Sequence, residues 1–200
     1  MNAKEEREDE LVLELLDAVG KRSDVSQRYL ARHMGVALGL ANSYLKRCVR
    51  KGFIKVSEAP ANRYLYYLTP KGFAEKGRLT ASYLSNSFAF YRRASASCAE
   101  AFTRCGQSGW RRIVLCGVSD LAEIASLQAN QSQVDIVGIY DPDSELARFI
   151  GRSVWRNLDE ASAFDACVLT DLANPVASYA KLVDALGADR VVVPDILRVS

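Results

Sequence analysis

The chain has 200 residues, of which 49% are hydrophobic and 25% are charged, and its formal net charge is +2. This composition excludes a disordered chain, a collagen and a coiled-coil rod, and it fits a globular protein of one large or two small domains. No apolar run approaches the ~18 residues of a membrane helix, and the acidic, polar N-terminus does not resemble a signal peptide. We therefore expect a cytoplasmic protein without a membrane partner.

The cysteines and the single histidine limit the chemistry that the chain can perform. An odd number of cysteines without CxxC spacing predicts neither a disulfide framework nor a zinc site; they are Cys48, Cys98, Cys105, Cys116 and Cys167. His33 is the only histidine, so a histidine-based triad or metal site has at most one centre. No nucleophile–base pair is recognisable, and we expect no catalytic residue, no metal and no enzymatic activity.

The net charge is the average of three different sections. Residues 21–80 carry 13 Lys and Arg against three acids, whereas residues 1–20 have a net charge of −5 and residues 81–200 a net charge of −3. A basic block of sixty residues is typical of a nucleic-acid-binding module, although a solvated basic surface would have the same composition.

The basic section has the pattern of a winged helix-turn-helix. Leucines at helical spacing precede Gly20, Ser26 can cap a helix over residues 27–34, and Gly35 supplies a tight turn before a second helix from about Leu38 to Lys51. Two strand-like runs follow, over residues 53–57 and 63–68, joined by a polar loop as in a β-hairpin. The sequence therefore predicts a DNA-binding domain over residues 1–69.

The second helix is the predicted recognition helix, which would lie in the major groove of double-stranded DNA. We place Leu40, Leu45, Cys48 and Val49 on its buried face. Asn42 is the best candidate for reading a base, because an amide can pair bidentately with adenine. The other expected DNA contacts are Ser43, Lys46, Arg47, Arg50 and, beside the wing, Arg63. A winged helix used only for protein contacts is the alternative.

Several stretches of this section resemble the MarR-type regulators associated with exopolysaccharide loci, across residues 10–95. The most specific is Leu-Thr-Pro-Lys-Gly at residues 68–72; the others are residues 26–31, 41–47 and 51–55. The resemblance implies a bacterial, dimeric DNA-binding regulator. Ala37 departs from the Ser expected at the N-cap of the recognition helix, which removes a cap worth roughly 1 kcal/mol.

A long helix is predicted to follow the wing over residues 70–105, with Thr69 as its N-cap and Pro70 in its first turn. Its apolar residues recur at alternating intervals of three and four, which is typical of a seam for a partner helix. We expect this helix, with residues 70–108 as a separate section, to form a homodimer through Leu84, Phe88, Tyr91, Cys98 and Phe102. The alternative is that the seam packs on the chain's own C-terminal domain.

Residues 109–200 alternate short β-branched runs with helices, which predicts a small Rossmann-like domain with a parallel sheet. The expected strands cover residues 112–117, 134–140, 153–155, 166–170 and 190–193, with helices over 121–131 and 176–186. The fold class is therefore a two-domain protein, with α+β and α/β parts joined by the long helix.

The first turn of this domain, at residues 117–122, occupies the place of a GxGxxG/A motif, of which only Gly117 remains as glycine. The candidate ligand-binding residues are Gly117, Ser119, Asp120, Asp141 and Asp171. Asp141 lies where an acidic residue could bind a ribose hydroxyl. The domain resembles those of nucleotide-sugar acyltransferases and dehydratases, which implies a nucleotide or nucleotide sugar as ligand. NAD(H) is a third candidate. A scaffold without a ligand is the alternative.

Together these patterns predict a sequence-specific, dimeric transcriptional regulator of polysaccharide or cell-envelope genes, with a C-terminal domain for sensing a small-molecule effector or for oligomerisation. The alternative is an enzyme or accessory factor of polysaccharide synthesis that uses its winged helix for protein docking.

Overall fold

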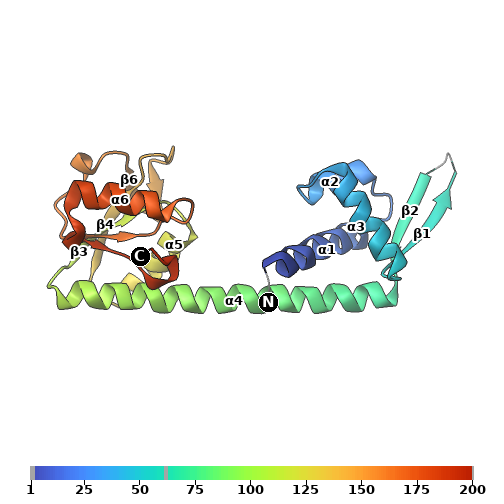
Figure 1. The fold of residues 1–200 in the computed structure, drawn as a ribbon, viewed down its shortest axis with the longest axis horizontal. Helices are drawn as coiled ribbons and strands as arrows, with labels where there is room; N and C mark the ends of the chain where they lie inside the picture. The colour runs from blue at the N-terminus through green and yellow to red at the C-terminus, as the bar shows by residue number, and fades with distance from the viewer. Residues whose placement is uncertain (1–2, 61–62, 200) are drawn as a thin grey trace. The chain divides into compact units, whose positions relative to one another are not determined.

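The computed structural model describes residues 3–60 and 63–199 (Figure 1). The chain divides into two units, Met1–Ser87 and Phe88–Ser200, and the division falls inside the long helix α4 (Pro70–Gln107). Each unit therefore contains part of the helix that was expected to form a section of its own. Among the described residues, no helix is both long enough and apolar enough to span a membrane.

The N-terminal unit contains three helices, a two-stranded sheet and the start of α4. The elements are α1 (Ala3–Lys21), α2 (Gln27–His33), α3 (Leu38–Arg50), β1 (Ile54–Ala59) and β2 (Arg63–Leu68). The two strands pair antiparallel, from Ile54 with Leu68 to Ala59 with Arg63. Leu15 and Leu16 of α1 and Leu30 of α2 lie at the centre of its core. The predicted helix-turn-helix and hairpin are both present.

The junction between β2 and α4 explains the Leu-Thr-Pro-Lys-Gly stretch physically. The Thr69 hydroxyl donates to the carbonyl of Gly52 at 2.6 Å and accepts from the N–H of Gly72 at 3.0 Å, so it caps α4 as expected. A side chain at residue 72 would overlap the carbonyl oxygen of Phe53, which requires glycine there. The Lys71 ammonium donates to the carbonyl of Lys51 at 3.0 Å. The motif therefore fastens the start of α4 to the end of α3.

The C-terminal unit contains a six-stranded mixed sheet in the order β5-β6-β4-β3-β7-β8. Strands β3, β4, β6, β7 and β8 are parallel, and β5 is an antiparallel edge strand. The strands are β3 (Arg112–Cys116), β4 (Asp135–Tyr140), β5 (Arg148–Phe149), β6 (Arg152–Trp155), β7 (Ala166–Leu169) and β8 (Val191–Val192); the helices are α5 (Asp120–Ala129) and α6 (Pro175–Leu186), with 3₁₀ turns at 158–160, 188–190 and 195–197.

Helices cover both faces of this sheet. Alternate residues of each strand point to opposite faces, and both sets pack against helices. Ile113 and Leu115 of β3 pack with α5 and with residues of α4, whereas Val114 and Cys116 pack with Leu182 of α6. Figure 1 shows α6 on one side of the sheet and the end of α4 on the other. The strand β3 is central in the sheet: β4, which follows it in the sequence, pairs with one of its edges, and the later strand β7 pairs with the other edge.

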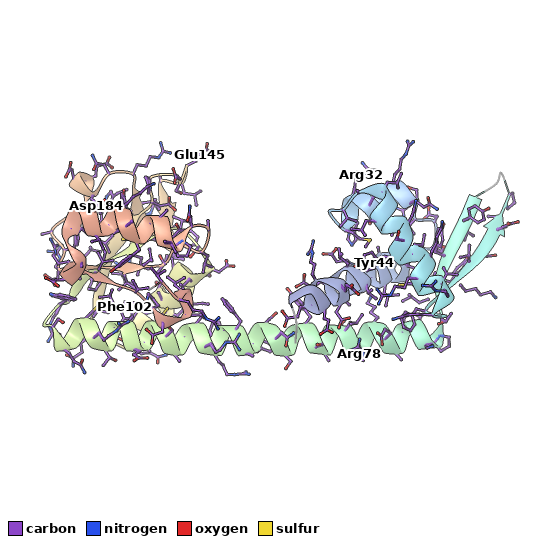
Figure 2. All side chains as sticks on the ribbon, in the orientation of Figure 1. Arg32, Tyr44, Arg78, Phe102, Glu145 and Asp184 are labelled. Atoms are coloured by element: carbon purple, nitrogen blue, oxygen red, sulfur yellow. The ribbon has the colours of Figure 1, made fainter. Side chains whose placement is uncertain are left out.

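Two residues of the expected dimer seam are buried in this core. Cys98 and Phe102 of α4 are 0% and 1% exposed, and they pack in the same cluster as Ile113 and Ala125. Figure 2 shows Phe102 on the side of α4 that faces the sheet. Their assignment to a partner helix is therefore wrong in this structure, because the chain's own sheet needs an apolar cover on this face.

Candidate nucleic-acid interface and candidate ligand cavity

The turn between α2 and α3 positions the predicted recognition helix. The Ser26 hydroxyl accepts from the N–H of Tyr29 at 3.1 Å and caps α2. Gly35 then adopts a positive φ of 61°, which a residue without a Cβ does at no cost, and Val36 bonds back to Ala31. Ala37 at the N-cap of α3 makes no side-chain hydrogen bond. The first turn of α3 is therefore uncapped, as its sequence predicts.

The buried face of α3 differs from the expected one at a single position. Leu45 and Cys48 are buried as expected, but Leu40 is 46% exposed and Ala41 takes its place in the core. An α-helix turns by about 100° per residue, so Ala41 shares a face with Leu45 and Cys48 and Leu40 does not. A leucine therefore lies on the surface of the predicted recognition helix.

The structure restricts both uncharged DNA-contact candidates of α3, Asn42 by partial burial and the exposed Ser43 by a hydrogen bond within its own helix. Asn42 is half-buried, and its Oδ1 is enclosed without a hydrogen-bond donor. Bidentate pairing with adenine would need this side chain to turn outward. The Ser43 hydroxyl donates to the carbonyl of Gly39 at 2.9 Å, within its own helix.

The basic residues of the N-terminal unit fall into two groups. Ion pairs with acidic residues, mostly of α1, engage one group: Arg47 with Glu8 at 3.0 Å, Lys76 and Lys21 with Asp17, Arg78 with Glu75 and Asp9. The pKa of Asp17 is lowered by its hydrogen bonds from Lys21 and Lys76, and the hydrogen bond that Arg47 donates to Glu8 raises the pKa of Arg47. Arg47 is therefore less free to contact a phosphate than the sequence suggested.

The second group has no ion pair or side-chain hydrogen bond within the described part of the chain. It consists of Arg28 and Arg32 on α2, Lys46 and Arg50 on α3, and Lys55 on β1, all of them exposed. Lys46 and Arg50 were expected, whereas Arg28, Arg32 and Lys55 were missed. The spacing of four between the two α2 arginines, which places them on one helix face, could have indicated them. Arg63 begins β2, but its side chain lies outside the described residues.

A groove lies beside this second group of cations. The start of α2, Leu38 of α3 and Tyr64 of the wing contribute to its walls. Tyr64 is exposed, and an aromatic side chain at this position on β2 was not singled out from the sequence. Of the five cations, Arg28 lines this groove, together with Leu38 of the recognition helix and residues of the wing.

Three residues of the expected dimer seam remain on the surface of α4. Leu84 is 45% exposed in the N-terminal unit, and Phe88 and Tyr91 are 57% and 42% exposed in the C-terminal unit. They follow one another at intervals of four and three, as a seam requires. In contrast to Cys98 and Phe102, each of these side chains is about half exposed within its own unit.

The candidate ligand cavity lies in the C-terminal unit, at the carboxyl ends of β3, β4 and β7. It has a volume of about 220 Å³, and Gly117, Asp141, Asp143, Asp171 and Lys181 contribute to its lining. Gly117, Asp141 and Asp171 are brought together as expected. Ser119 and Asp120 are not among its lining residues; Ser119 is the N-cap of α5 and Asp120 is its first residue. Asp143 and Lys181 were missed.

Four of the five expected ligand-binding residues, Gly117, Ser119, Asp141 and Asp171, have structural roles inside the chain. Asp141 accepts from the N–H of Val118 at 2.8 Å and from the N–H of Asp143 at 3.0 Å. Ser119 caps α5 and donates to the carbonyl of Thr170. Gly117 has φ +111°, and a side chain there would overlap the backbone of Asp171. These residues therefore hold the loops of the sheet edge together.

Asp171 also accepts hydrogen bonds from other residues of the chain. Burial alone would raise its pKa, but hydrogen bonds from Ser178, Ala173 and Asn174 outweigh burial, and the pKa is lowered. The carboxylate therefore stays charged and fixed at the start of α6. Its lone pairs are largely occupied before any ligand arrives.

All five cysteines are free and buried. Burial raises the pKa of Cys98 to about 12 and that of Cys48 and Cys105 to about 11, which keeps these thiols protonated and unreactive. Within the described residues no cluster of three or more His, Cys, Asp or Glu side chains could hold a metal ion.

The helix-turn-helix, the wing and the unpaired cations together define a winged helix-turn-helix of the DNA-binding type. Residues 8–55 match the family model described as winged helix-turn-helix DNA-binding. This match covers α1 from residue 8 onward, all of α2 and α3, and the first two residues of β1. A comparison with curated proteins finds no match.

Solved structures with local similarity include two regulators and one further protein. A MarR family protein of Mycobacterium tuberculosis with p-aminosalicylic acid matches 36% of this chain and 55% of its own at 25% identity and a TM-score of 0.32. Streptococcus pneumoniae FabT in complex with DNA matches 39% and 55% at 25% identity and a TM-score of 0.32. PigF with SAH matches 95% and 56% at 13% identity and a TM-score of 0.26. The chain spans about half the length of each structure, and these TM-scores do not establish a shared overall fold.

Proposed function

We propose that this protein is a sequence-specific, dimeric DNA-binding transcriptional regulator, which controls polysaccharide or cell-envelope genes in response to a small molecule. The observation that carries the proposal is the separation of the cations in the N-terminal unit. Acidic side chains neutralise cations near α1 and α4, whereas Arg28, Arg32, Lys46, Arg50 and Lys55 of α2, α3 and β1 make no ion pair within residues 3–60 and 63–199. Unpaired cations around a helix of this shape favour the DNA backbone as partner.

The test is the salt dependence of DNA binding, measured by fluorescence anisotropy with an operator selected from random DNA. Lys46→Ala combined with Arg50→Ala should weaken specific and non-specific binding and lower the slope of log K against log salt by about two units. Lys181→Ala combined with Arg148→Ala removes the same charges from the C-terminal unit and serves as the control. A wild-type protein without salt-dependent affinity would contradict the proposal and favour a protein-docking winged helix.

The exposed part of α4 supports the proposed homodimer. Leu84, Phe88 and Tyr91 expose apolar surface at heptad-like spacing, which a second copy of the helix would cover. A two-fold dimer would also present two recognition helices to the half-sites of a palindrome. Phe88→Asp should halve the mass in light scattering, and Leu127→Asp on α5, an equally exposed leucine, should not. A monomeric wild-type protein would contradict the dimer.

The strand order supports a Rossmann-like C-terminal domain that binds an effector. In open α/β sheets, ligands bind at the carboxyl edge where the strand order reverses, and the cavity beside Gly117 lies at such a point, between the ends of β3 and β7. Its volume of about 220 Å³ is below the ~300–1,000 Å³ of usual ligand pockets, which favours a mononucleotide-sized ligand over NAD(H). A nucleotide would present its hydroxyls to Asp141 and Asp143 and its phosphate to Lys181.

A thermal-shift screen of nucleotides, nucleotide sugars, NAD(H) and coenzyme A tests this domain. A nucleotide-type ligand should raise the melting temperature of the wild-type protein, and Lys181→Ala should reduce the shift without changing the ligand-free melting temperature. Since Lys181 is exposed and makes no ion pair within the described residues, its loss leaves the fold intact. A uniformly flat screen would favour a sheet that acts only as a scaffold.

A further inference from the structure

The first turn of α3 exposes apolar surface where the recognition helix would meet DNA. Leu38 and Leu40 are 43% and 46% exposed, and Ser43, Lys46 and Arg50 further along the same helix are exposed as well. Successive residues of a helix lie about 100° apart, so the two leucines flank Gly39 on either side. In helix-turn-helix proteins, the N-terminal residues of the recognition helix contact the base edges.

The fold of the described residues does not require a glycine at position 39. A Cβ at this position would meet nothing within 4 Å, and its backbone is ordinary helix. Glycine inside a helix destabilises it by roughly 0.5–1 kcal/mol relative to alanine. A residue that costs stability without any packing benefit is expected where another molecule must approach the backbone closely.

The polar groups of the same turn are poorly placed to read bases. The Asn42 Oδ1 is enclosed, and the Ser43 hydroxyl already donates to the carbonyl of Gly39. The cations Lys46 and Arg50 lie about two and three turns further along the helix, where phosphates are in reach. The exposed leucines are therefore the side chains of the first turn that remain free to meet a base edge.

We propose that Leu38 and Leu40 determine the DNA sequence preference of this protein by packing against thymine C5-methyl groups in the major groove, with Gly39 between them allowing close approach. This inference rests on the proposed DNA-binding function. The thymine methyl is the apolar group that distinguishes one base pair from another in that groove. Unpaired cations on the same helix supply the charge complementarity that brings the phosphate backbone to this surface.

The experiment replaces thymine by deoxyuridine, which removes only the methyl group, at one position at a time of the operator selected by the wild-type protein. One or two positions per half-site should lose about fourfold in affinity, the factor that corresponds to ~0.8 kcal/mol for one buried methyl group. With Leu40→Ala, the loss at one of these positions should disappear, because the methyl group no longer has a contact to lose. Leu40→Met should retain it.

Leu127→Ala, which truncates an equally exposed leucine of α5, is the matched control and should leave every deoxyuridine effect unchanged. Circular dichroism checks that the α3 variants fold. If the wild-type protein binds DNA with the expected salt dependence but is indifferent to deoxyuridine, or if Leu38→Ala and Leu40→Ala keep the full effect, thymine reading is wrong while the proposed function stands. A lower mass of Leu40→Ala in light scattering with unchanged deoxyuridine effects would place the leucines in a protein interface instead. Absence of salt-dependent binding would overturn both.

Discussion

The two units of this chain use their polar side chains in opposite ways. In the N-terminal unit, Arg28, Arg32, Lys46, Arg50 and Lys55 are exposed and make no ion pair among the described residues, while Arg47 and other cations pair with acids, mostly of α1. In the C-terminal unit, Asp141, Ser119 and Asp171 all hold loops of the sheet edge together. The difference teaches that a residue type in a suggestive place indicates binding only when its polar atoms are left free.

The comparison extends to the two parts of α4. Phe88 and Phe102 are phenylalanines on one helix, at positions of the same predicted seam, but one is exposed and the other completely buried. The periodicity is the same for both, and the sheet beneath residues 94–105 accounts for the difference. Substitutions can therefore test each side of the comparison with a closely matched partner.

The largest effect is expected from Phe102→Ala. Truncating a fully buried phenylalanine removes apolar contacts and leaves a cavity, which costs about 3–5 kcal/mol in the free energy of unfolding. Phe88→Ala should change the free energy of unfolding by less than about 1 kcal/mol, when it is measured at a protein concentration low enough to keep the protein monomeric. Urea unfolding followed by circular dichroism measures both, and equal effects would refute the assignment of Phe102 to the core.

Asp141→Ala should destabilise the C-terminal unit by roughly 1.5–3 kcal/mol, the usual range for hydrogen bonds to a charged group. The change leaves the N–H groups of Val118 and Asp143 without their acceptor. Asp143→Ala, which removes a carboxylate from the same cavity without breaking these two bonds, is the control. Differential scanning calorimetry gives the answer, and unchanged stability would identify Asp141 as a ligand contact rather than a structural residue.

Arg50→Ala and Arg47→Ala separate an unpaired cation from a paired one on the same helix. Arg50→Ala should lower the slope of log K against log salt by about one unit, because a phosphate contact is lost. Arg47→Ala should lower it by less, since Glu8 already neutralises this guanidinium. Anisotropy titrations at four salt concentrations suffice, and a larger effect of Arg47 would mean that its ion pair opens when DNA binds.

The smallest effect is a loss of stability in alkaline solution. Below about pH 9 the Cys98 thiol is protonated in both states, but above it the unfolded chain ionises while burial keeps the folded thiol protonated to about pH 12. Stability is therefore lost as the pH rises from 9, by on the order of 1 kcal/mol at pH 10 for this group. Cys98→Ala should reduce the slope of the urea midpoint against pH between 9 and 10, and an unchanged slope would exclude the thiol as its source.

Local patterns predicted most of the fold. Ser26, Gly35, Thr69 and Pro70 act through neighbours in sequence, so the turns and helix starts that they define were placed correctly. The strand β5 was missed because two residues, Arg148 and Phe149, carry no periodicity. Leu40 was assigned to the wrong face because leucine at helical spacing is usually buried, whereas here the smaller Ala41 fills that space.

The site was predicted less completely because its residues depend on contacts between distant segments. The pairing of Arg47 with Glu8 joins residues 39 positions apart, and nothing in the order of residues indicates which cation α1 will engage. The same holds for Gly117, whose conformation depends on the approach of Asp171 from the next loop along the sheet. Sequence patterns identified the elements that carry the sites, and tertiary contacts decided which atoms remain available.

The junction at Thr69 has a mechanical consequence for the N-terminal unit. Thr69 donates a hydrogen bond to the carbonyl of Gly52, Lys71 donates one to that of Lys51, and Gly72 lies against the backbone of Phe53. These contacts restrict movement of the first turn of α4 relative to the end of α3. A flexible junction at this point would let α4 move independently of α3, whereas these contacts couple the start of α4 rigidly to the recognition helix. Rotation of α4 about its own axis in its first turns must therefore tilt α3 as well.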